Sequence, residues 1–284
     1  MFPILIDFGS HELPLLGRTH LFLPTYGAVF AGATVLAWWW FLRRGRTLGI
    51  AEDRLFSLSF YTLVAGIVGA KLTLVAVDWR MYLEHPVALA GTLRAAGVLM
   101  GGIIAGGLMF AAYARRAGLP FLRLADAIAA PLALAQGLGR FGCFLAGCCW
   151  GVRASQHTPF ALTFTDAAAH RQTGVELHVP LVPTQLYQMT NDLLLAALLT
   201  WLWKRRPEPA GTIAWLYVLL YCVGRGVIEF WRGDRDRGLY FGEVVSTSQL
   251  LSLAGVALAL AMLLRGRRAL RGGGALAAAA RARR

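Results

Sequence analysis

Charged residues are scarce in this chain of 284 residues. Lysine, arginine, aspartate and glutamate together make up 15% of it, whereas a soluble domain carries about 25%. The charges are clustered, and long apolar runs separate the clusters. Runs of about 20 apolar residues can cross a bilayer. The composition, 57% hydrophobic, therefore excludes an ordinary soluble domain and predicts an integral membrane protein.

Cysteine is also sparse, and the start of the chain lacks a basic segment. The chain has four cysteines: Cys143, Cys148, Cys149 and Cys222. Their number and spacing do not make a zinc site or a disulfide scaffold, so no metal and no cofactor is expected. No basic stretch precedes an apolar one in the first twenty residues, which argues against a cleaved signal peptide. That segment, which contains Pro3 and Pro14, is expected to lie at the membrane interface before the first span.

The net charge of +13 could indicate nucleic-acid binding, but the layout of the charges argues against it. The surplus sits in short clusters between apolar segments: Arg43, Arg44, Arg46, Arg115, Arg116, Lys204, Arg205, Arg206 and the tail from residue 265. Cytoplasmic loops of membrane proteins have this pattern. The expected partner is the membrane, and no nucleic acid.

Seven transmembrane helices are predicted, at about residues 21–42, 55–77, 95–114, 124–138, 184–203, 211–230 and 246–264. Basic clusters follow spans one, three, five and seven, which predicts an extracytoplasmic N-terminus and a cytoplasmic C-terminus. A small extracytoplasmic element with short strands is expected at about 152–182. The fold class is thus an all-α integral membrane protein. It forms one transmembrane domain over residues 1–271, with a disordered basic tail at 272–284.

The third predicted span is rich in glycine, including Gly101 and Gly102. Glycines four residues apart leave a smooth face on which a second helix can pack closely. One interpretation of Gly101 and Gly102 is packing alone. The other is that they make room for a lipid chain or head group, which makes both candidate substrate-binding residues.

The fourth predicted span is short, because 15 residues rise only about 22 Å as a helix and the hydrocarbon core is about 30 Å thick. Asp126, near its start, is interpreted as a helix-start carboxylate. The span runs into Gly139-Arg140-Phe141-Gly142-Cys143 and then Cys148-Cys149-Trp150-Gly151. Irregular backbone at membrane depth is tolerated only inside protein or beside a cavity. Residues 137–151 are therefore expected to border a polar cavity near the outer face.

Arg140 is the main candidate in this stretch. An arginine in a membrane is costly unless it is paired or used, and its planar guanidinium suits phosphate. Flanking glycines such as Gly142 let a ligand approach the backbone. The alternative is an interfacial arginine that extends to lipid head groups. The neighbouring cysteines are expected to form a disulfide or to pack, rather than to supply a catalytic thiol.

A second charged group lies near the outer end of the sixth predicted span. Arg225 and Glu229 are four residues apart and share a helix face, and Arg232 lies near the same side. Glu229 can neutralise one arginine, which leaves a net positive site. The alternative is a structural ladder of ion pairs.

Two polar motifs open other spans. Gln185, in Pro183-Thr184-Gln185-Leu186-Tyr187, is a polar group in a membrane helix, although a helix start with packing hydrogen bonds is the alternative. Tyr26, at the outer end of the first span, is either a site residue or an interfacial anchor.

Taken in chain order, these motifs resemble the prolipoprotein diacylglyceryl transferase family, over nearly the whole chain. The resemblance rests on Pro24-Thr25-Tyr26-Gly27, residues 139–151, Pro183-Thr184-Gln185-Leu186-Tyr187, Arg225 with Glu229, Phe230 and Arg232, and Ser248-Gln249-Leu250-Leu251-Ser252.

The resemblance implies an enzyme of the bacterial inner membrane. Such an enzyme transfers the diacylglyceryl group of phosphatidylglycerol to the lipobox cysteine thiol of a preprolipoprotein signal peptide, forming a thioether and releasing glycerol phosphate. It further implies that Arg140 and Arg225 act on the phosphodiester and that Glu229 or Tyr26 takes or relays the thiol proton. The implied substrate-binding set includes Arg140, Gly142, Cys143, Gly151, Gln185, Tyr187 and Arg232.

The chain departs from the family pattern at several polar positions. Met100 stands where the family has a histidine, and methionine cannot accept a proton. Cys143 and Ala146 replace asparagines, and Cys148 replaces a glutamate. Two alternatives therefore stay open. One is a paralogous membrane enzyme that uses an anionic phospholipid with a different acceptor, and the other is a non-enzymatic lipid-binding or transport protein.

Overall fold

The computed structural model describes residues 2–13, 17–85, 89, 92, 97–155, 158, 160–205, 208–233, 239–240 and 245–282. The chain divides into two compact units, Met1–Trp40 with Ala125–Arg284, and Phe41–Leu124. All candidate site residues except Gly101 and Gly102 belong to the first unit.

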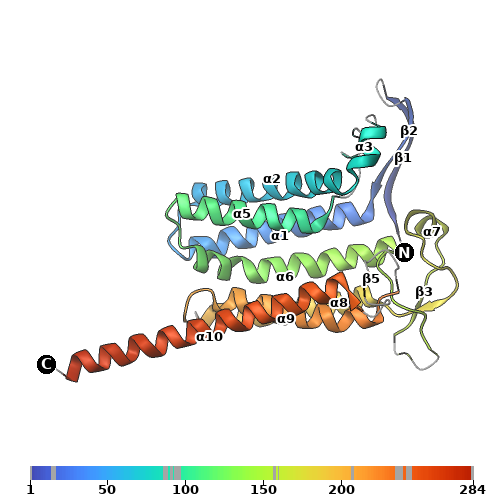
Figure 1. Cartoon of the computed structure of the whole chain (residues 1–284). Coiled ribbons are helices and arrows are strands. Elements are labelled where there is room, and N and C mark those ends of the chain that lie inside the picture. Colours follow the sequence, from blue (N-terminus) through green and yellow to red (C-terminus); the bar gives the residue numbers. More distant parts are fainter. Residues whose placement is uncertain are drawn as a thin grey trace. The chain divides into compact units, whose positions relative to one another are not determined.

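The seven predicted helices are all present (Figure 1): α1 Thr25–Arg46, α2 Glu52–Val77, α5 Leu99–Arg116, α6 Phe121–Ala146, α8 Thr184–Arg205, α9 Thr212–Ile228 and α10 Thr247–Ala282. Residues 95–96 of the third predicted span lie outside the described residues. Among the described residues, five helices are long and apolar enough to cross a membrane: Thr25–Arg46, Glu52–Val77, Phe121–Ala146, Thr212–Trp231 and Thr247–Arg268. The predicted class, a mostly helical membrane protein, is confirmed at this level.

Residues 4–13 and 17–24 form a pair of strands that the sequence analysis did not predict, and the interfacial position expected for this segment stays a prediction. Strand β1 (Ile4–Leu13) pairs antiparallel with β2 (Gly17–Pro24). The side chains of Asp7 and His20 lie 3.3 Å apart across the pair. Isoleucine and phenylalanine favour strands, a preference that apolar content alone does not reveal. The all-α prediction was therefore wrong for this segment.

Residues 147–155 and 160–182 form a small element with a core of its own. Strands β3 (Leu162–Thr163) and β4 (Pro180–Leu181) pair antiparallel, so short strands are present, and the extracytoplasmic position expected for them stays a prediction. Helix α7 (Ala167–Thr173) is capped by Asp166, whose carboxylate accepts hydrogen bonds from the backbone N–H groups of residues 168 and 169. The core consists of Phe164, Ala169, Val175 and Leu181. A further strand pair, β5 (Leu239–Tyr240) with β6 (Val245–Ser246), precedes α10.

In the unit Phe41–Leu124, α2 and α5 pack side by side (Figure 1), and the short helix α3 (Trp79–Glu84) follows α2. The glycines of the third predicted span make this close contact possible. A Cβ atom at Gly101 would overlap Thr73 and lie 2.7 Å from the Gly69 carbonyl oxygen. One at Gly102 would lie 3.0 Å from the Gly66 carbonyl oxygen. The packing interpretation of both glycines therefore has direct structural support.

In the larger unit, helices α6, α8 and α9 share one apolar core. Its buried members are Ala129, Ala130, Ala133, Leu195, Ala196, Leu199 and Ile213. Asp126 joins α6 to α9, because its carboxylate accepts hydrogen bonds from the backbone N–H groups of Gly211 (2.7 Å) and Ala214 (2.9 Å). Asp126 thus caps the start of α9, and the prediction that it serves the start of its own helix was wrong.

Helix α6 is longer than the predicted fourth span. It continues through residues 137–146, for which irregular backbone was expected. The glycines serve packing here: a Cβ atom would lie 3.2 Å from the Leu193 side chain at Gly137, and 3.3 Å from the Tyr26 ring at Gly142. The chain turns only at Gly147, which has a φ of +75°. With 26 residues, α6 can cross the full hydrocarbon core.

Helix α10 begins with reciprocal capping. The Ser246 hydroxyl accepts a hydrogen bond from the Gln249 backbone N–H (3.2 Å), and the Gln249 side chain accepts one from the Ser246 N–H (2.9 Å). This is a capping box. The helix then runs to Ala282, so the tail expected to be disordered is helical over residues 272–282, while 283–284 lie outside the described residues. Alanine and arginine, abundant there, are strong helix formers.

Candidate active site

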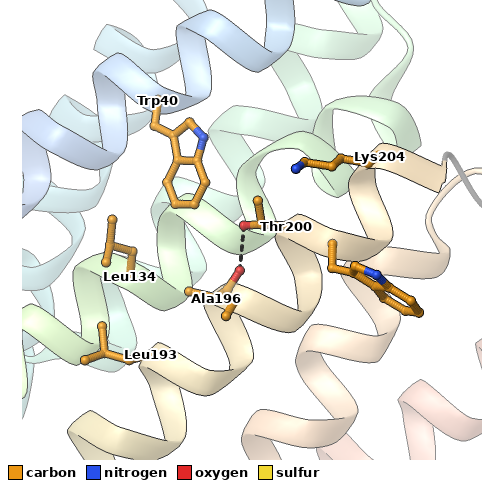
Figure 2. A pocket seen from close by; sticks show the side chains of 8 residues that line it. Trp40, Leu134, Leu193, Ala196, Thr200 and Lys204 are labelled. Carbon is orange, nitrogen blue, oxygen red and sulfur yellow. Dashed lines mark hydrogen bonds between the residues drawn. The ribbon is translucent and has the colours of Figure 1, made fainter.

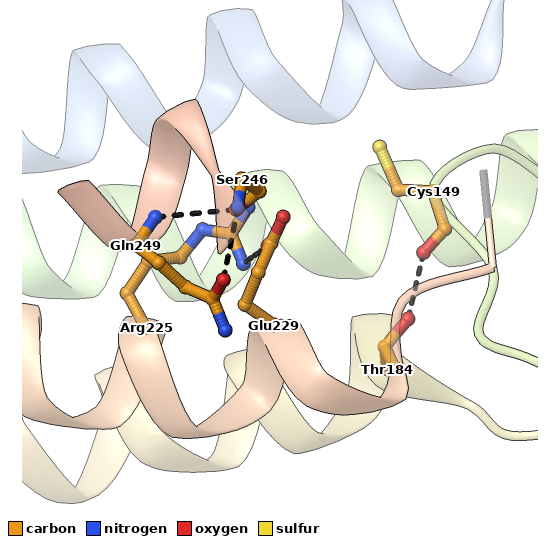
Figure 3. Close-up of polar contacts among 6 residues, drawn as sticks. All are labelled: Cys149, Thr184, Arg225, Glu229, Ser246 and Gln249. Atoms are coloured by element: carbon orange, nitrogen blue, oxygen red, sulfur yellow. Dashed lines mark hydrogen bonds and ion pairs between the residues drawn. The ribbon is translucent and has the colours of Figure 1, made fainter. Parts of the chain in front are cut away.

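Three arginines form a polar centre in the larger unit. Arg140 lies in α6, Arg225 in α9, and Arg232 directly after the short helix η1 (Glu229–Trp231), and each interacts electrostatically with the others. The predicted pairing of Arg225 with Glu229 is confirmed, since Nη1 of Arg225 lies 2.5 Å from Oε2 of Glu229 (Figure 3). Glu229 is only 2% exposed. The ion pair is therefore shielded from solvent.

Asp192 of α8 belongs to the same centre and was missed in the sequence analysis. Its Oδ1 accepts hydrogen bonds from the side-chain amides of Gln188 (2.8 Å) and Asn191 (3.1 Å). The carboxylate, 1% exposed, interacts electrostatically with Arg140 and Arg225. A carboxylate inside a membrane helix is itself a functional signal, so Asp192 could have been chosen from the sequence.

The centre has an excess of positive charge. Among the described residues, and with both carboxylates ionised, three guanidinium groups face Glu229 and Asp192, which leaves one positive charge. Tyr221 of α9 adds a phenol that interacts electrostatically with Arg140, Asp192 and Arg225. A phosphodiester carries a single negative charge, and guanidinium groups are well suited to bind it.

The turn after α6 gathers three thiols beside this centre. The Sγ atoms of Cys143, Cys148 and Cys149 all lie within 4.8 Å of one another. All are free, as is Cys222. The disulfide alternative is thus not what the structure shows. Cys149 has a left-handed backbone, with a φ of 61°, which is unusual for a residue other than glycine.

The motif at the start of α8 holds this turn in place. The Thr184 hydroxyl donates a hydrogen bond to the Cys149 carbonyl (2.8 Å; Figure 3), and the Gln185 amide donates one to the Cys148 carbonyl (2.7 Å). Both side chains are buried. Gln185 therefore has a definite structural task next to the centre.

The electrostatic surroundings favour the thiolate form of Cys149. Hydrogen bonds from the thiols of Cys143 and Cys148, together with the charges of Arg232 and Arg140, hold the pKa of the Cys149 thiol below its ordinary value in spite of burial.

Gly151 links the signature stretch to Arg232. The two residues form an isolated antiparallel bridge, and the Gly151 N–H donates to the Val182 carbonyl (2.9 Å). A Cβ atom at Gly151 would lie 2.5 Å from the Trp231 carbonyl oxygen. A glycine at position 151 therefore lets two other backbone segments approach closely. Its bridge to Arg232 holds that residue in position.

The two candidate tyrosines are placed differently. Tyr26, near the start of α1, interacts electrostatically with Cys143, Cys148 and Arg140, while 39% of it is exposed. Tyr187 is half-buried in α8, two residues beyond the buried Gln185.

Gly101, Gly102 and Met100 belong to the other unit, Phe41–Leu124. The contacts described for the two glycines are with α2. Their assignment to the substrate site stays a prediction.

A separate groove of about 440 Å³ lies between α1, α6 and α8 (Figure 2). Its lining is mainly apolar: Trp40, Leu134, Leu193, Ala196, Ala197, Thr200, Trp201 and Lys204. The Thr200 hydroxyl is satisfied by the Ala196 carbonyl at 2.6 Å. None of the arginines of the centre lines this groove, so the chemistry is not expected there.

A net-positive polar centre among membrane helices defines a membrane protein suited to an anionic lipid head group. The model of the prolipoprotein diacylglyceryl transferase family matches residues 16–265. The chain is 36% identical to the phosphatidylglycerol–prolipoprotein diacylglyceryl transferase of Clostridium tetani, over 80% of this chain and 87% of that protein. It is 32% identical to transferase 2 of Clostridium perfringens (81% and 85%) and 28% identical to the Ralstonia pickettii transferase (84% and 87%). The chain belongs to the prolipoprotein diacylglyceryl transferase family.

Proposed function

We propose that this chain transfers the diacylglyceryl group of phosphatidylglycerol to the lipobox cysteine of a preprolipoprotein signal peptide. A thioether forms and glycerol phosphate leaves. The observation that carries the proposal is the centre of Arg140, Arg225 and Arg232, which face two carboxylates, Glu229 and Asp192, among the residues that the structure describes. Family membership supports it, since the relatives named above are transferases of this kind by name.

In this proposal the arginines act on the phosphodiester. Arg140 and Arg225 bind its oxygens and stabilise the negative charge that grows on the departing phosphate. Glu229 keeps Arg225 in position through the 2.5 Å ion pair. Arg232, held by the bridge to Gly151, adds a third positive charge to the site.

In this proposal the acceptor peptide binds on the side of the centre where the thiols of Cys143, Cys148 and Cys149 lie. Tyr26 interacts electrostatically with both Arg140 and the cysteines, which supports a role for its phenol between the proposed lipid and peptide sites. Gly142, Cys143, Gln185 and Tyr187 complete the proposed substrate set in this unit.

We further propose that α5 and α8 also cross the membrane, giving seven spans. Helix α5 has 18 residues, enough for about 27 Å. Helix α8 has low overall hydropathy because Gln185, Gln188 and Asp192 interrupt it, but all three are buried inside the protein. Basic last turns of α1, α5 and α8 then lie in the cytoplasm of a bacterial cell, with residues 152–182 and the N-terminus outside.

The test is a transfer reaction with purified full-length protein, phosphatidylglycerol and a synthetic lipobox peptide, read by mass spectrometry. A diacylglyceryl mass increase on the peptide cysteine is expected, with none on a peptide that carries serine instead. No increase, with phosphatidylglycerol still bound, would favour a relative with a different acceptor. Failure to bind phosphatidylglycerol would contradict the lipid site itself.

A further inference from the structure

The chemistry proposed for the arginines does not use the thiol groups of Cys143, Cys148 and Cys149. Cys143 lies in the last turn of α6 and is 7% exposed, while Cys148 and Cys149 follow in the turn and are half-buried. Their Sγ atoms lie within 4.8 Å of one another and none is in a disulfide. Three free thiols converge here from a stretch of seven residues.

The backbone holds these thiols together. The Cys148 N–H donates to the Cys143 carbonyl (3.1 Å), and the carbonyls of Cys148 and Cys149 are held by Gln185 and Thr184. The left-handed conformations of Gly147 and Cys149 close the turn. The cluster is thus supported by hydrogen bonds from a second helix, as a preorganised ligand set would be.

The spacing is close to that of a metal site. Thiolates on a tetrahedral zinc ion, at Zn–S distances of about 2.3 Å, stand about 3.8 Å apart. An inward shift of each sulfur by at most about 0.6 Å would bring the cluster to that spacing. Thiolates select soft or borderline ions such as Zn²⁺.

The charges around the cluster also fit. Three thiolates and one Zn²⁺ carry a net charge of −1. Arg140 and Arg232 both interact electrostatically with Cys149, so positive charge lies close to this anionic cluster. Three protein ligands leave the fourth tetrahedral position open, which is the pattern of catalytic rather than structural zinc.

We propose that Cys143, Cys148 and Cys149 bind a zinc ion whose fourth position takes the acceptor cysteine thiol. This inference rests on the proposed transferase function and deepens it. The sequence spacing argued against zinc because it does not match known zinc motifs, whereas the folded turn brings the three sulfurs together.

The acceptor thiol binds zinc and releases its proton to water, because a coordinated thiol is deprotonated. The thiolate sulfur attacks the carbon of the diacylglyceryl group that bears the phosphate ester. The carbon–sulfur bond forms, the carbon–oxygen bond breaks, and its electron pair leaves with glycerol phosphate beside the arginines. The neutral thioether then leaves the metal. Zinc thereby forms the thiolate in a chain that has Met100 in place of the family histidine.

The metal site is tested on the full-length protein, freed of metal by a chelator and titrated with Zn²⁺ and Co²⁺. One ion per chain is expected, with thiolate-to-cobalt charge-transfer absorption. Cys149→Ser should weaken binding at least a hundredfold, whereas Cys222→Ser, in α9, should bind as wild type. Absence of a stoichiometric ion, or equal affinity in Cys149→Ser, would overturn the site.

A second measurement needs no variant. Zinc should protect Cys143, Cys148 and Cys149 of the wild-type chain from alkylation, with Cys222 as the internal control in the same peptide map. Equal alkylation of the three thiols with and without zinc would count against the site even if Cys149→Ser fails to fold.

The acceptor role is tested separately from transfer. The lipobox peptide should change the absorption of the cobalt-loaded protein, and the serine peptide should not; no change would overturn the role given to the fourth position. Metal-free protein should transfer at least a hundredfold more slowly, with zinc restoring the rate. Full transfer without metal would overturn the zinc inference and leave the transferase standing. A cobalt spectrum that responds to the peptide without any transfer would count against the transferase and leave the metal site standing.

Discussion

The guanidinium of Arg225 and the carboxylate of Glu229 lie 2.5 Å apart, because the two residues are four positions apart on one helical turn. Both side chains are largely shielded from solvent. Arg225 also interacts electrostatically with Arg232 and Arg140. The carboxylate thus offsets repulsion among arginines that the centre brings together. Without it, three guanidinium groups would share a space of low polarity.

Glu229→Ala should destabilise the protein strongly. Removing one partner of a buried ion pair costs about 3–5 kcal/mol, because the other charge is left uncompensated. Thermal unfolding in detergent measures this. Glu176→Ala is the matched control, since Glu176 pairs with exposed Arg153 at 2.8 Å, and such a pair contributes at most about 1 kcal/mol. Similar losses in the two variants would contradict the buried role of Glu229.

Asp192→Asn should reduce transfer with little change in fold. The substitution keeps the shape of the side chain but removes the carboxylate charge that interacts with Arg140 and Arg225, so the two guanidinium groups lose a partner that orients them. We expect kcat/KM for phosphatidylglycerol to fall about tenfold, the effect of roughly 1.4 kcal/mol of lost transition-state stabilisation. Unchanged kinetics in a correctly folded variant would remove Asp192 from the centre.

Gly101→Ala should disrupt the packing of α5 on α2. The added methyl group would overlap Thr73, and overpacking of this kind costs about 1–3 kcal/mol. Gly107→Ala, in the same helix, meets nothing within 4 Å and should stabilise the helix by about 0.5–1 kcal/mol. Melting temperatures of the two variants compare them. If Gly101→Ala kept its stability but lost lipid binding, the substrate interpretation would replace the packing one.

The positions of the helices followed from the sequence because apolar runs and basic clusters are properties of the chain itself. The pairing of Arg225 with Glu229 followed from helical spacing. The strand pair of residues 4–13 and 17–24 and the full length of α6 did not follow, since both depend on long-range contacts. Gly137 and Gly142 read as loop glycines until the structure placed another helix against each of them.

For the candidate site, too, the sequence predicted some features and missed others. Each arginine stood out because charge in a membrane is costly. The convergence of Cys143, Cys148 and Cys149 did not, because it depends on a turn that Thr184 and Gln185, 35 or more residues later, hold closed. Asp126 was misassigned for a related reason, as its partners Gly211 and Ala214 are distant in sequence.

The most direct test of the central claim is the rate of diacylglyceryl transfer from phosphatidylglycerol to a lipobox peptide in Arg140→Ala, with Arg153→Ala as control. Arg153 is exposed and pairs with Glu176, so its loss should leave the rate near that of the wild type. Arg140→Ala should insert into the membrane and yet lose transfer, because the phosphodiester has lost its guanidinium. Wild-type turnover in Arg140→Ala would contradict the account.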